Sequence, residues 1–171
     1  LFIAENQCIR RNSCNVAETL SDFTGLFQRL LGDNIELQIS VDPDLWLVRG
    51  NVRELDNILV PLVVNARDAM RRGGTLRIKA HNVSMGTDPQ SIIFGSDYVL
   101  IEVSDDGVGI PEDIRERVFE PFVSGKEADG WGLAMVYHAV NNLNGRISFE
   151  SEAGRGTTFR IILGRHWEPS R

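Results

Sequence analysis

One amide side chain, Asn65, falls on the predicted buried stripe of a helix. It follows Ile58 by seven residues and Leu62 by three, spacings that place all three on one helix face. A buried amide among aliphatic side chains costs free energy unless a partner satisfies it. A magnesium ion carrying phosphates would be such a partner, because Mg²⁺ prefers hard oxygen ligands, and Asp68 follows within one turn. The alternative is an Asn bonded to backbone, which Asn65 taken alone favours.

A second group of polar residues follows a predicted buried strand, in the run Ser104 to Ile110 (SDDGVGI). Asp105, at the end of such a strand, is suited to accept a hydrogen bond from an exocyclic amine such as that of adenine. Gly107 and Gly109 allow the backbone to pass close to a flat ligand, because glycine has no Cβ. The alternative is an ordinary Asp-Gly turn, which is common in proteins.

A third group is glycine-rich and precedes the last predicted helix. Lys126 follows Ser124-Gly125, and Gly130-Trp131-Gly132-Leu133 opens the helix. Free N–H groups and the positive end of the helix dipole favour an anion there. Lys126 would reach a phosphate as a flexible point charge. A glycine pair before a helix is equally typical of a hinge, so this pattern alone is weak.

These residues are attached to alternating helices and paired strands. Capping pairs predict helices that begin at Asn15, with Glu18, and at Asn51, with Glu54. A short helix is expected after Pro111 and a last one around Leu133. Strands are predicted at 35–41, 45–48, 75–83, 98–103, 146–151 and 157–163. Paired strands favour an α/β (α+β) two-layer sandwich, with a mixed, mostly antiparallel sheet covered on one face by about three helices.

Length and composition restrict the class of protein. The chain has 171 residues, which suits one domain, and its net charge of −6 argues against a nucleic-acid partner. Its two cysteines give neither a disulfide framework nor a metal pattern, so a reducing cytoplasm is expected. No apolar run approaches the roughly 20 residues of a membrane helix. We therefore expect no membrane contact by this segment; a parent protein's anchor would lie outside it.

Taken together, the order and spacing of these groups resemble the ATP-binding domain of sensor histidine kinases. That domain has the Bergerat fold, shared with gyrase and heat-shock ATPases. The four segments that carry the resemblance are Leu62–Met70 (LVVNARDAM), Asp105–Gly109, Phe119–Phe122 (FEPF) and Gly130–Ala134, similar to the N, G1, F and G2 boxes. The NARDAM and FEPF strings are the most specific. They are typical of the subgroup that includes nitrogen-regulation sensors and many hybrid kinases.

The resemblance implies ATP and Mg²⁺ as cofactors and assigns roles to individual residues. Asn65 would ligate Mg²⁺, Asp105 would bind the adenine amine, and Lys126 would contact the phosphates. Gly107 and Gly109 would line the purine pocket, while Gly130 and Gly132 would anchor a lid. The further expected nucleotide contacts are Asp68, Ile110, Phe119, Trp131 and Leu133.

The same resemblance implies partners outside this chain. The γ-phosphoryl group would pass to a histidine on a separate dimerisation domain, and from there to a response-regulator receiver domain. The parent would be a homodimer. None of His81, His138 and His166 is followed by an acidic residue, as the family's phosphoacceptor is. We therefore interpret residues 1–14 as the remnant of the dimerisation helix or a linker, 15–164 as the catalytic domain and 165–171 as a tail.

Four residues depart from the family's pattern. Pro61 stands one turn before Asn65, where relatives usually have a polar residue, and it removes a helix hydrogen bond. Ala128, Asp129 and Trp131 alter the lid, and Asp129 brings a negative charge toward the expected phosphates. These departures keep a second hypothesis open, a degenerate domain that binds nucleotide weakly and acts as an interaction module.

Overall fold

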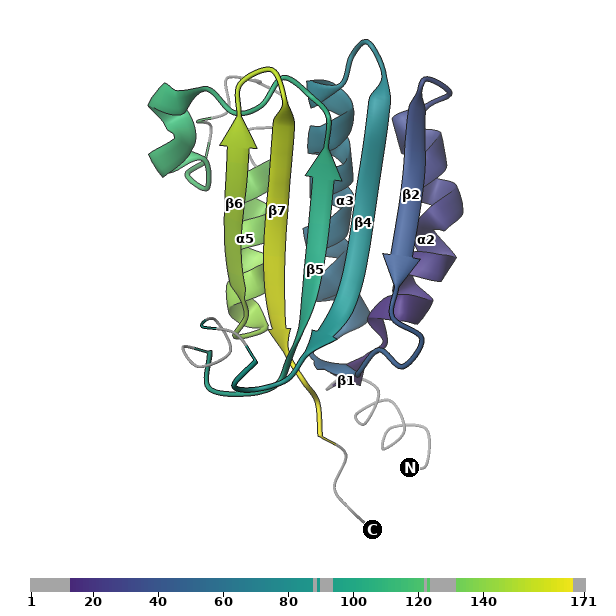
Figure 1. Cartoon of the computed structure of the whole chain (residues 1–171), viewed down its shortest axis with the longest axis vertical. Coiled ribbons are helices and arrows are strands. Elements are labelled where there is room, and N and C mark those ends of the chain that lie inside the picture. The colour runs from purple at the N-terminus through teal and green to yellow at the C-terminus, as the bar shows by residue number, and fades with distance from the viewer. Residues whose placement is uncertain (1–12, 88, 90–93, 122, 124–131, 168–171) are drawn as a thin grey trace.

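The computed structural model describes residues 13–87, 89, 94–121, 123 and 132–167 (Figure 1). In chain order the elements are β1 (Ser13–Cys14), α2 (Val16–Leu31), β2 (Ile35–Val41), β3 (Val48–Arg49), α3 (Val52–Ala69), β4 (Gly74–Val83), β5 (Tyr98–Asp105), the 3₁₀ helix η1 (Glu112–Arg117), α5 (Gly132–Asn142), β6 (Arg146–Glu152) and β7 (Gly156–Gly164).

Five strands form the main sheet, in the order β2-β4-β5-β7-β6. β2 pairs with β4 in parallel, and the other pairs are antiparallel. The helices α2, α3 and α5 cover one face of this sheet (Figure 1). The core lies between these layers and includes Leu55, Ile78 and Ile101, which are fully buried. The predicted two-layer sandwich with a mixed, mostly antiparallel sheet is confirmed.

Both predicted helix starts are capped as the sequence indicates. The side-chain oxygen of Asn15 accepts from the backbone N–H of Glu18 at 3.1 Å, and that of Asn51 accepts from Glu54 at 2.9 Å. Each bond satisfies an N–H group that the first helical turn leaves free. Neither α2 nor α3, nor any other helix in the described ranges, combines the length and apolar character needed to cross a bilayer.

The second predicted strand, at 45–48, is corrected by the structure. Only Val48–Arg49 is a strand, and it pairs with Ser13–Cys14 in a separate two-stranded sheet. Trp46 does not join it, because its backbone N–H donates to the side chain of Asn82 at 2.9 Å. Ser13 and Cys14 therefore pair with the domain that was predicted to begin at residue 15. Residues 1–12 lie outside the described residues.

Arg165, the first residue of the predicted tail, contacts Asp97, Trp46 and Trp167. Its backbone N–H donates to the carbonyl of Asp97 at 3.0 Å, and its guanidinium pairs with the Asp97 carboxylate at 3.4 Å. The same guanidinium lies over the rings of Trp46 and Trp167, at 4.2 and 3.7 Å from their centroids. Cation–π contacts of this kind stabilise the position of Arg165 against the domain.

A carboxylate on α3, Asp56, is a predicted weak point of the fold. Its Oδ1 is buried and has no hydrogen-bond partner among the residues that the structure describes. Burial raises the pKa of Asp56 above its usual value of 3.8. The ionised form therefore destabilises the folded state at neutral pH, and the penalty disappears as the pH falls and the carboxyl group protonates.

We expect Asp56→Asn to stabilise the domain at pH 7 by up to about 1 kcal/mol, because it removes the charge that burial disfavours, and solvent screening keeps this gain small at a half-buried residue. The melting temperature should rise by roughly 2–4 °C. Thermal melts from pH 7 to pH 3 test this, with Asp22→Asn on the exposed face of α2 as the control. A gain that persists at pH 3, or one equal to the control's, would contradict the explanation.

Candidate functional site

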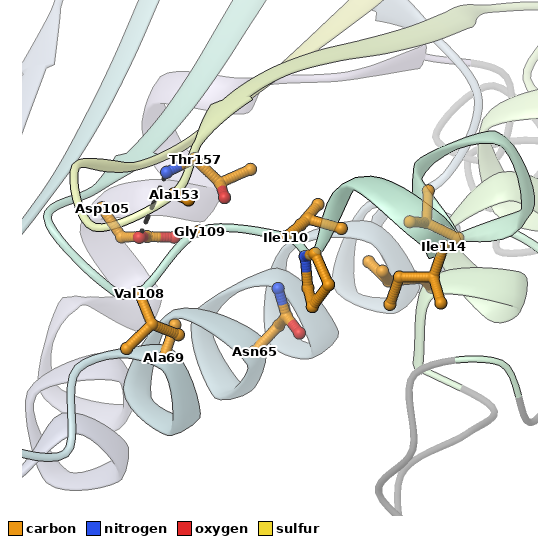
Figure 2. Close-up of a pocket in the computed structure, with 12 residues that line it drawn as sticks. Asn65, Ala69, Asp105, Val108, Gly109, Ile110, Ile114, Ala153 and Thr157 are labelled. Carbon is orange, nitrogen blue, oxygen red and sulfur yellow. Dashed lines mark hydrogen bonds between the residues drawn. The ribbon is translucent and has the colours of Figure 1, made fainter.

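A cavity of about 330 Å³ opens between α3 and the segment that follows β5 (Figure 2). η1, the start of α5 and the turn between β6 and β7 complete its walls. The lining residues are Asn65, Ala69, Asp105, Val108, Gly109, Ile110, Pro111, Ile114, Val118, Leu133, Ala153 and Thr157. Most of these side chains are apolar, and the few polar ones lie at separate points. Such a composition is typical of small-molecule sites.

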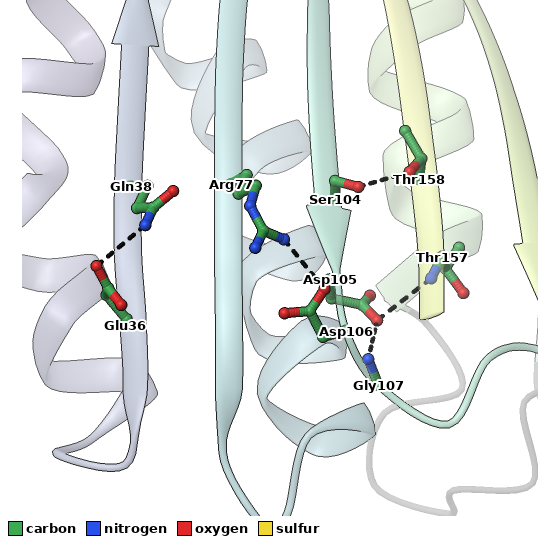
Figure 3. A network of polar contacts seen from close by, with 9 residues as sticks. All are labelled: Glu36, Gln38, Arg77, Ser104, Asp105, Asp106, Gly107, Thr157 and Thr158. Carbon is green, nitrogen blue, oxygen red and sulfur yellow. Dashed lines mark hydrogen bonds and ion pairs between the residues drawn. The ribbon is translucent and has the colours of Figure 1, made fainter. Parts of the chain in front are cut away.

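Asp105 is the buried carboxylate of this cavity, with 6% of its surface exposed. Its Oδ1 accepts from the backbone N–H of Gly107 at 2.8 Å and from that of Thr157 at 3.3 Å (Figure 3). Desolvation raises the pKa of Asp105, the two amide hydrogen bonds lower it, and the charge of Asp106 raises it. Oδ2 has no hydrogen-bond partner among the described residues. The carboxylate is thus oriented through one oxygen and offers the other as an acceptor.

Neighbouring atoms of the protein leave no room for a side chain at Gly107 or at Gly109. A Cβ on Gly107 would lie 2.6 Å from the Cβ and carbonyl oxygen of Ala69, at the end of α3. Gly109 has φ +78°, and a Cβ there would lie 2.6 Å from the carbonyl oxygen of Glu152. Of these two predicted residues, Gly109 lines the cavity and Gly107 does not. Gly107 instead supplies a backbone N–H to Asp105.

Asn65 lies on α3, one turn before Ala69, and its side chain lines the cavity (Figure 2). Its amide has no hydrogen-bond partner within the described part of the chain, so no backbone group there satisfies it. Asp68 does not line this cavity. It pairs with Arg67 at 3.4 Å and, together with Gly107, lines a neighbouring open hollow.

Phe119 lies away from the cavity lining and in an aromatic cluster. Its ring stacks on Tyr137 of α5 at 5.4 Å between centroids and meets Phe149 of β6 edge-on at 5.9 Å. Such pairs add stability beyond the area they bury. Phe119 therefore connects the segment after η1 to α5 and β6, and it is not among the residues that line the cavity.

Two further predicted residues line the cavity, Leu133 at the start of α5 and Ile110 in the segment after β5. Gly132 lies opposite Pro61, since a Cβ on Gly132 would stand 4.0 Å from the Cβ of Pro61. α3 continues through Pro61 without interruption.

The other predicted site residues lie outside the described residues. They are Lys126, Gly130 and Trp131, together with the divergent Ala128 and Asp129.

Thr157 is the polar lining residue that the sequence analysis missed. It is 4% exposed, and the register of β5 against β7 sets it directly opposite Asp105. The strand 157–163 was predicted, and so was its hairpin with 146–151, but its pairing with the strand that ends at Asp105 was not. Pairing it antiparallel to the strand before Asp105 would have placed Thr157 in the site. The apolar lining residues Val108, Ile114, Val118 and Ala153 gave no separate signal.

Comparison with known proteins identifies a matching family and several relatives. Residues 50–166 match the family described as histidine kinase-, DNA gyrase B- and HSP90-like ATPase. Sensor kinase CckA of Brucella abortus is 38% identical over 100% of this chain, which covers 19% of CckA. Sensory histidine kinase/phosphatase NtrB of Rhodobacter capsulatus is 40% identical over 71% of this chain, which covers 35% of NtrB. The chain thus spans a minor part of each relative.

Solved structures share the fold. The mycobacterial sensor histidine kinase MprB superposes with a TM-score of 0.73 at 23% identity, over 90% of this chain and 96% of that one. Full-length ShkA in complex with AMPPNP gives a TM-score of 0.75 at 24% identity, over 94% of this chain and 33% of ShkA. The chain accordingly belongs to the histidine kinase-, DNA gyrase B- and HSP90-like ATPase family.

Proposed function

We propose that this chain binds Mg–ATP and acts as the catalytic domain of a sensor histidine kinase. It would transfer the γ-phosphoryl group to a histidine on a separate dimerisation domain. The observation that carries the proposal is the Asp105 carboxylate, buried at one end of an apolar cavity and fixed through one oxygen by two backbone amides. Such an acceptor suits the exocyclic amine of adenine, and apolar walls suit the faces of a purine.

Asn65 supports the assignment of the phosphate end. Its amide lies on the α3 wall of the cavity without a partner among the described residues, so its oxygen is available to a hard cation. Within the described ranges, no group of three or more His, Cys, Asp or Glu side chains is placed to hold a metal ion. This fits Mg²⁺, which is usually held by one or two protein groups and the substrate's phosphates. When bound, Mg²⁺ would neutralise phosphate charge during transfer. Lys126 is proposed as the second phosphate contact.

The chemistry of the lining favours transfer over hydrolysis. Among the described lining residues, Asp105 is the only carboxylate, and one of its oxygens is committed to backbone amides. Pro61, one turn before Asn65, offers no group that would activate water. We therefore propose phosphoryl transfer to a histidine as the reaction. We propose too that the parent is a cytoplasmically exposed homodimer that passes the phosphoryl group to a receiver domain.

The second candidate function is a degenerate domain that acts as an interaction module. The residue that favours it within the described part is Pro61, which replaces a usual polar group. α3 nevertheless stays continuous, and Asn65 and Asp105 line one cavity, so the substitution leaves the site formed.

Calorimetric titration of the chain with ATP and ADP, with and without MgCl₂, tests the two functions. A kinase domain should bind both nucleotides, and Mg²⁺ should increase the affinity for ATP. Absence of binding to either nucleotide at millimolar concentration would contradict the proposal and support the degenerate domain.

A further inference from the structure

The hydroxyl of Ser151, on β6, joins three segments around the cavity. The backbone N–H of Ile110 donates to its Oγ at 2.7 Å. The same Oγ donates to the carbonyl oxygen of Gly156 at 3.2 Å and lies 2.9 Å from Oγ1 of Thr157. Ser151 does not itself line the cavity, but Ile110 and Thr157 do. It is therefore placed to act on a ligand through them.

The protons of this group can be counted. A serine hydroxyl has one proton to donate and two lone pairs to accept with. If the Ser151 proton goes to the Gly156 carbonyl, the two acceptor positions are filled by the Ile110 N–H and the Thr157 O–H. The Thr157 hydroxyl has then given its only proton to Ser151. Toward the cavity it presents lone pairs.

The neighbouring polar groups likewise offer acceptors, and not donors, to a ligand. The backbone N–H groups of Gly107 and Thr157 both donate to Oδ1 of Asp105, so they are not available to a ligand. Burial raises the pKa of Asp105, and these two amide bonds act against that rise by favouring the ionised carboxylate, which only accepts. The polar end of the cavity thus offers acceptors from both Asp105 and Thr157. A ligand group placed there must be a donor, or it leaves buried acceptors unpaired, which is costly.

We propose that Ser151 is a positioning residue that fixes the Thr157 hydroxyl as an acceptor, and that the site thereby selects purines with a 6-amino group over those with a 6-oxo group. This inference rests on the proposed nucleotide binding and adds to it a residue outside the cavity that controls base selection. Without Ser151, the Thr157 hydroxyl would be free to turn and donate to a 6-oxo group.

The test compares ATP with ITP, whose base carries a 6-oxo group. Dissociation constants are measured by calorimetry for the wild-type chain, Ser151→Ala, Ser151→Thr and Ser148→Ala. Ser148 is exposed on the same strand and serves as the matched control. In Ser151→Ala the preference for ATP over ITP should fall about three- to tenfold, as expected for one hydrogen bond. Ser151→Thr keeps the hydroxyl and should retain the preference, as should Ser148→Ala.

A purely structural role of Ser151 predicts a different result. Both affinities would then fall by the same factor, and an unchanged ratio in Ser151→Ala would overturn the inference. Thr157→Val provides a second measurement that does not depend on the folding of Ser151→Ala. It should lower the preference by itself, and Ser151→Ala added to it should lower it no further; a preference unchanged in Thr157→Val would also overturn the inference. If the wild-type chain binds neither nucleotide, it is the proposed function that fails.

Discussion

Asp105→Asn is expected to weaken ATP binding about ten- to hundredfold, the value of a hydrogen bond to a charged group, while the domain stays folded. The structure gives the reason for both effects. An Asn oxygen in the position of Oδ1 can still accept from the backbone amides of Gly107 and Thr157, so the turn after β5 is retained. The Asn NH₂ group then replaces Oδ2. This NH₂ group and the adenine amine are both donors, so they cannot form the hydrogen bond that Oδ2 would accept.

Stability and pH dependence separate this effect from unfolding. Desolvation raises the pKa of Asp105 above its usual 3.8, so the ionised carboxylate destabilises the folded state at neutral pH. The melting temperature of Asp105→Asn at pH 7 should therefore not fall. In the wild-type chain, ATP affinity should decrease as the pH drops through the folded-state pKa, because protonation removes the anionic acceptor. Asp105→Asn should lack that decrease.

Asp106→Asn is the matched control for this experiment. Asp106 is adjacent in sequence and half exposed, it pairs with Arg77 at 3.0 Å (Figure 3), and it does not line the cavity. Exposed pairs contribute little to stability, and losing the Asp106 charge lowers the pKa of Asp105 and so keeps that carboxyl ionised. At pH 7 this variant should therefore resemble the wild type in both affinity and melting temperature. Equal ATP affinity of Asp105→Asn and Asp106→Asn would show that Asp105 does not bind the base.

The features that could be predicted from the sequence depend on local patterns. The Asn15 and Asn51 caps each need only a residue three positions away, and the apolar stripe that carries Asn65 needs only helical spacing. The position of Asp105 at the end of a buried strand is likewise local. Each of these interactions is complete within one or two turns or one strand, so the sequence specifies it without knowledge of the fold.

The features that were missed depend on contacts between distant segments. Thr157 enters the site through the register of β7 against β5, a pairing across 52 residues. Gly107 was expected against the ligand and lies against Ala69, because the end of α3 approaches the turn after β5. Arg165 was expected in a tail, and its contact with Trp46 joins two segments that lie far apart in the sequence.

Asn65→Ala tests the other end of the proposed nucleotide site. If the Asn65 oxygen ligates Mg²⁺, its removal should abolish the gain in ATP affinity that Mg²⁺ produces. Adenosine binding should change by less than about twofold, because the base contacts at Asp105 are untouched. With the parent's dimerisation domain added, phosphotransfer should fall by roughly 10²–10³-fold, the usual loss when one preorganised electrostatic group is removed.

Asn57→Ala on the same helix is the matched control, since both variants replace Asn by the best helix former and any gain in helix propensity is shared. The Asn65 amide has no hydrogen-bond partner among the described residues, so its loss should not lower stability relative to Asn57→Ala. A structural Asn would behave in the opposite way, because removing it would leave backbone groups unpaired and lower the melting temperature. The proposal would be contradicted by an Asn65→Ala variant that has a lower melting temperature than Asn57→Ala and still shows the full Mg²⁺-dependent gain in ATP affinity. Asn65 would then have a structural role, and it would not be a ligand of the metal.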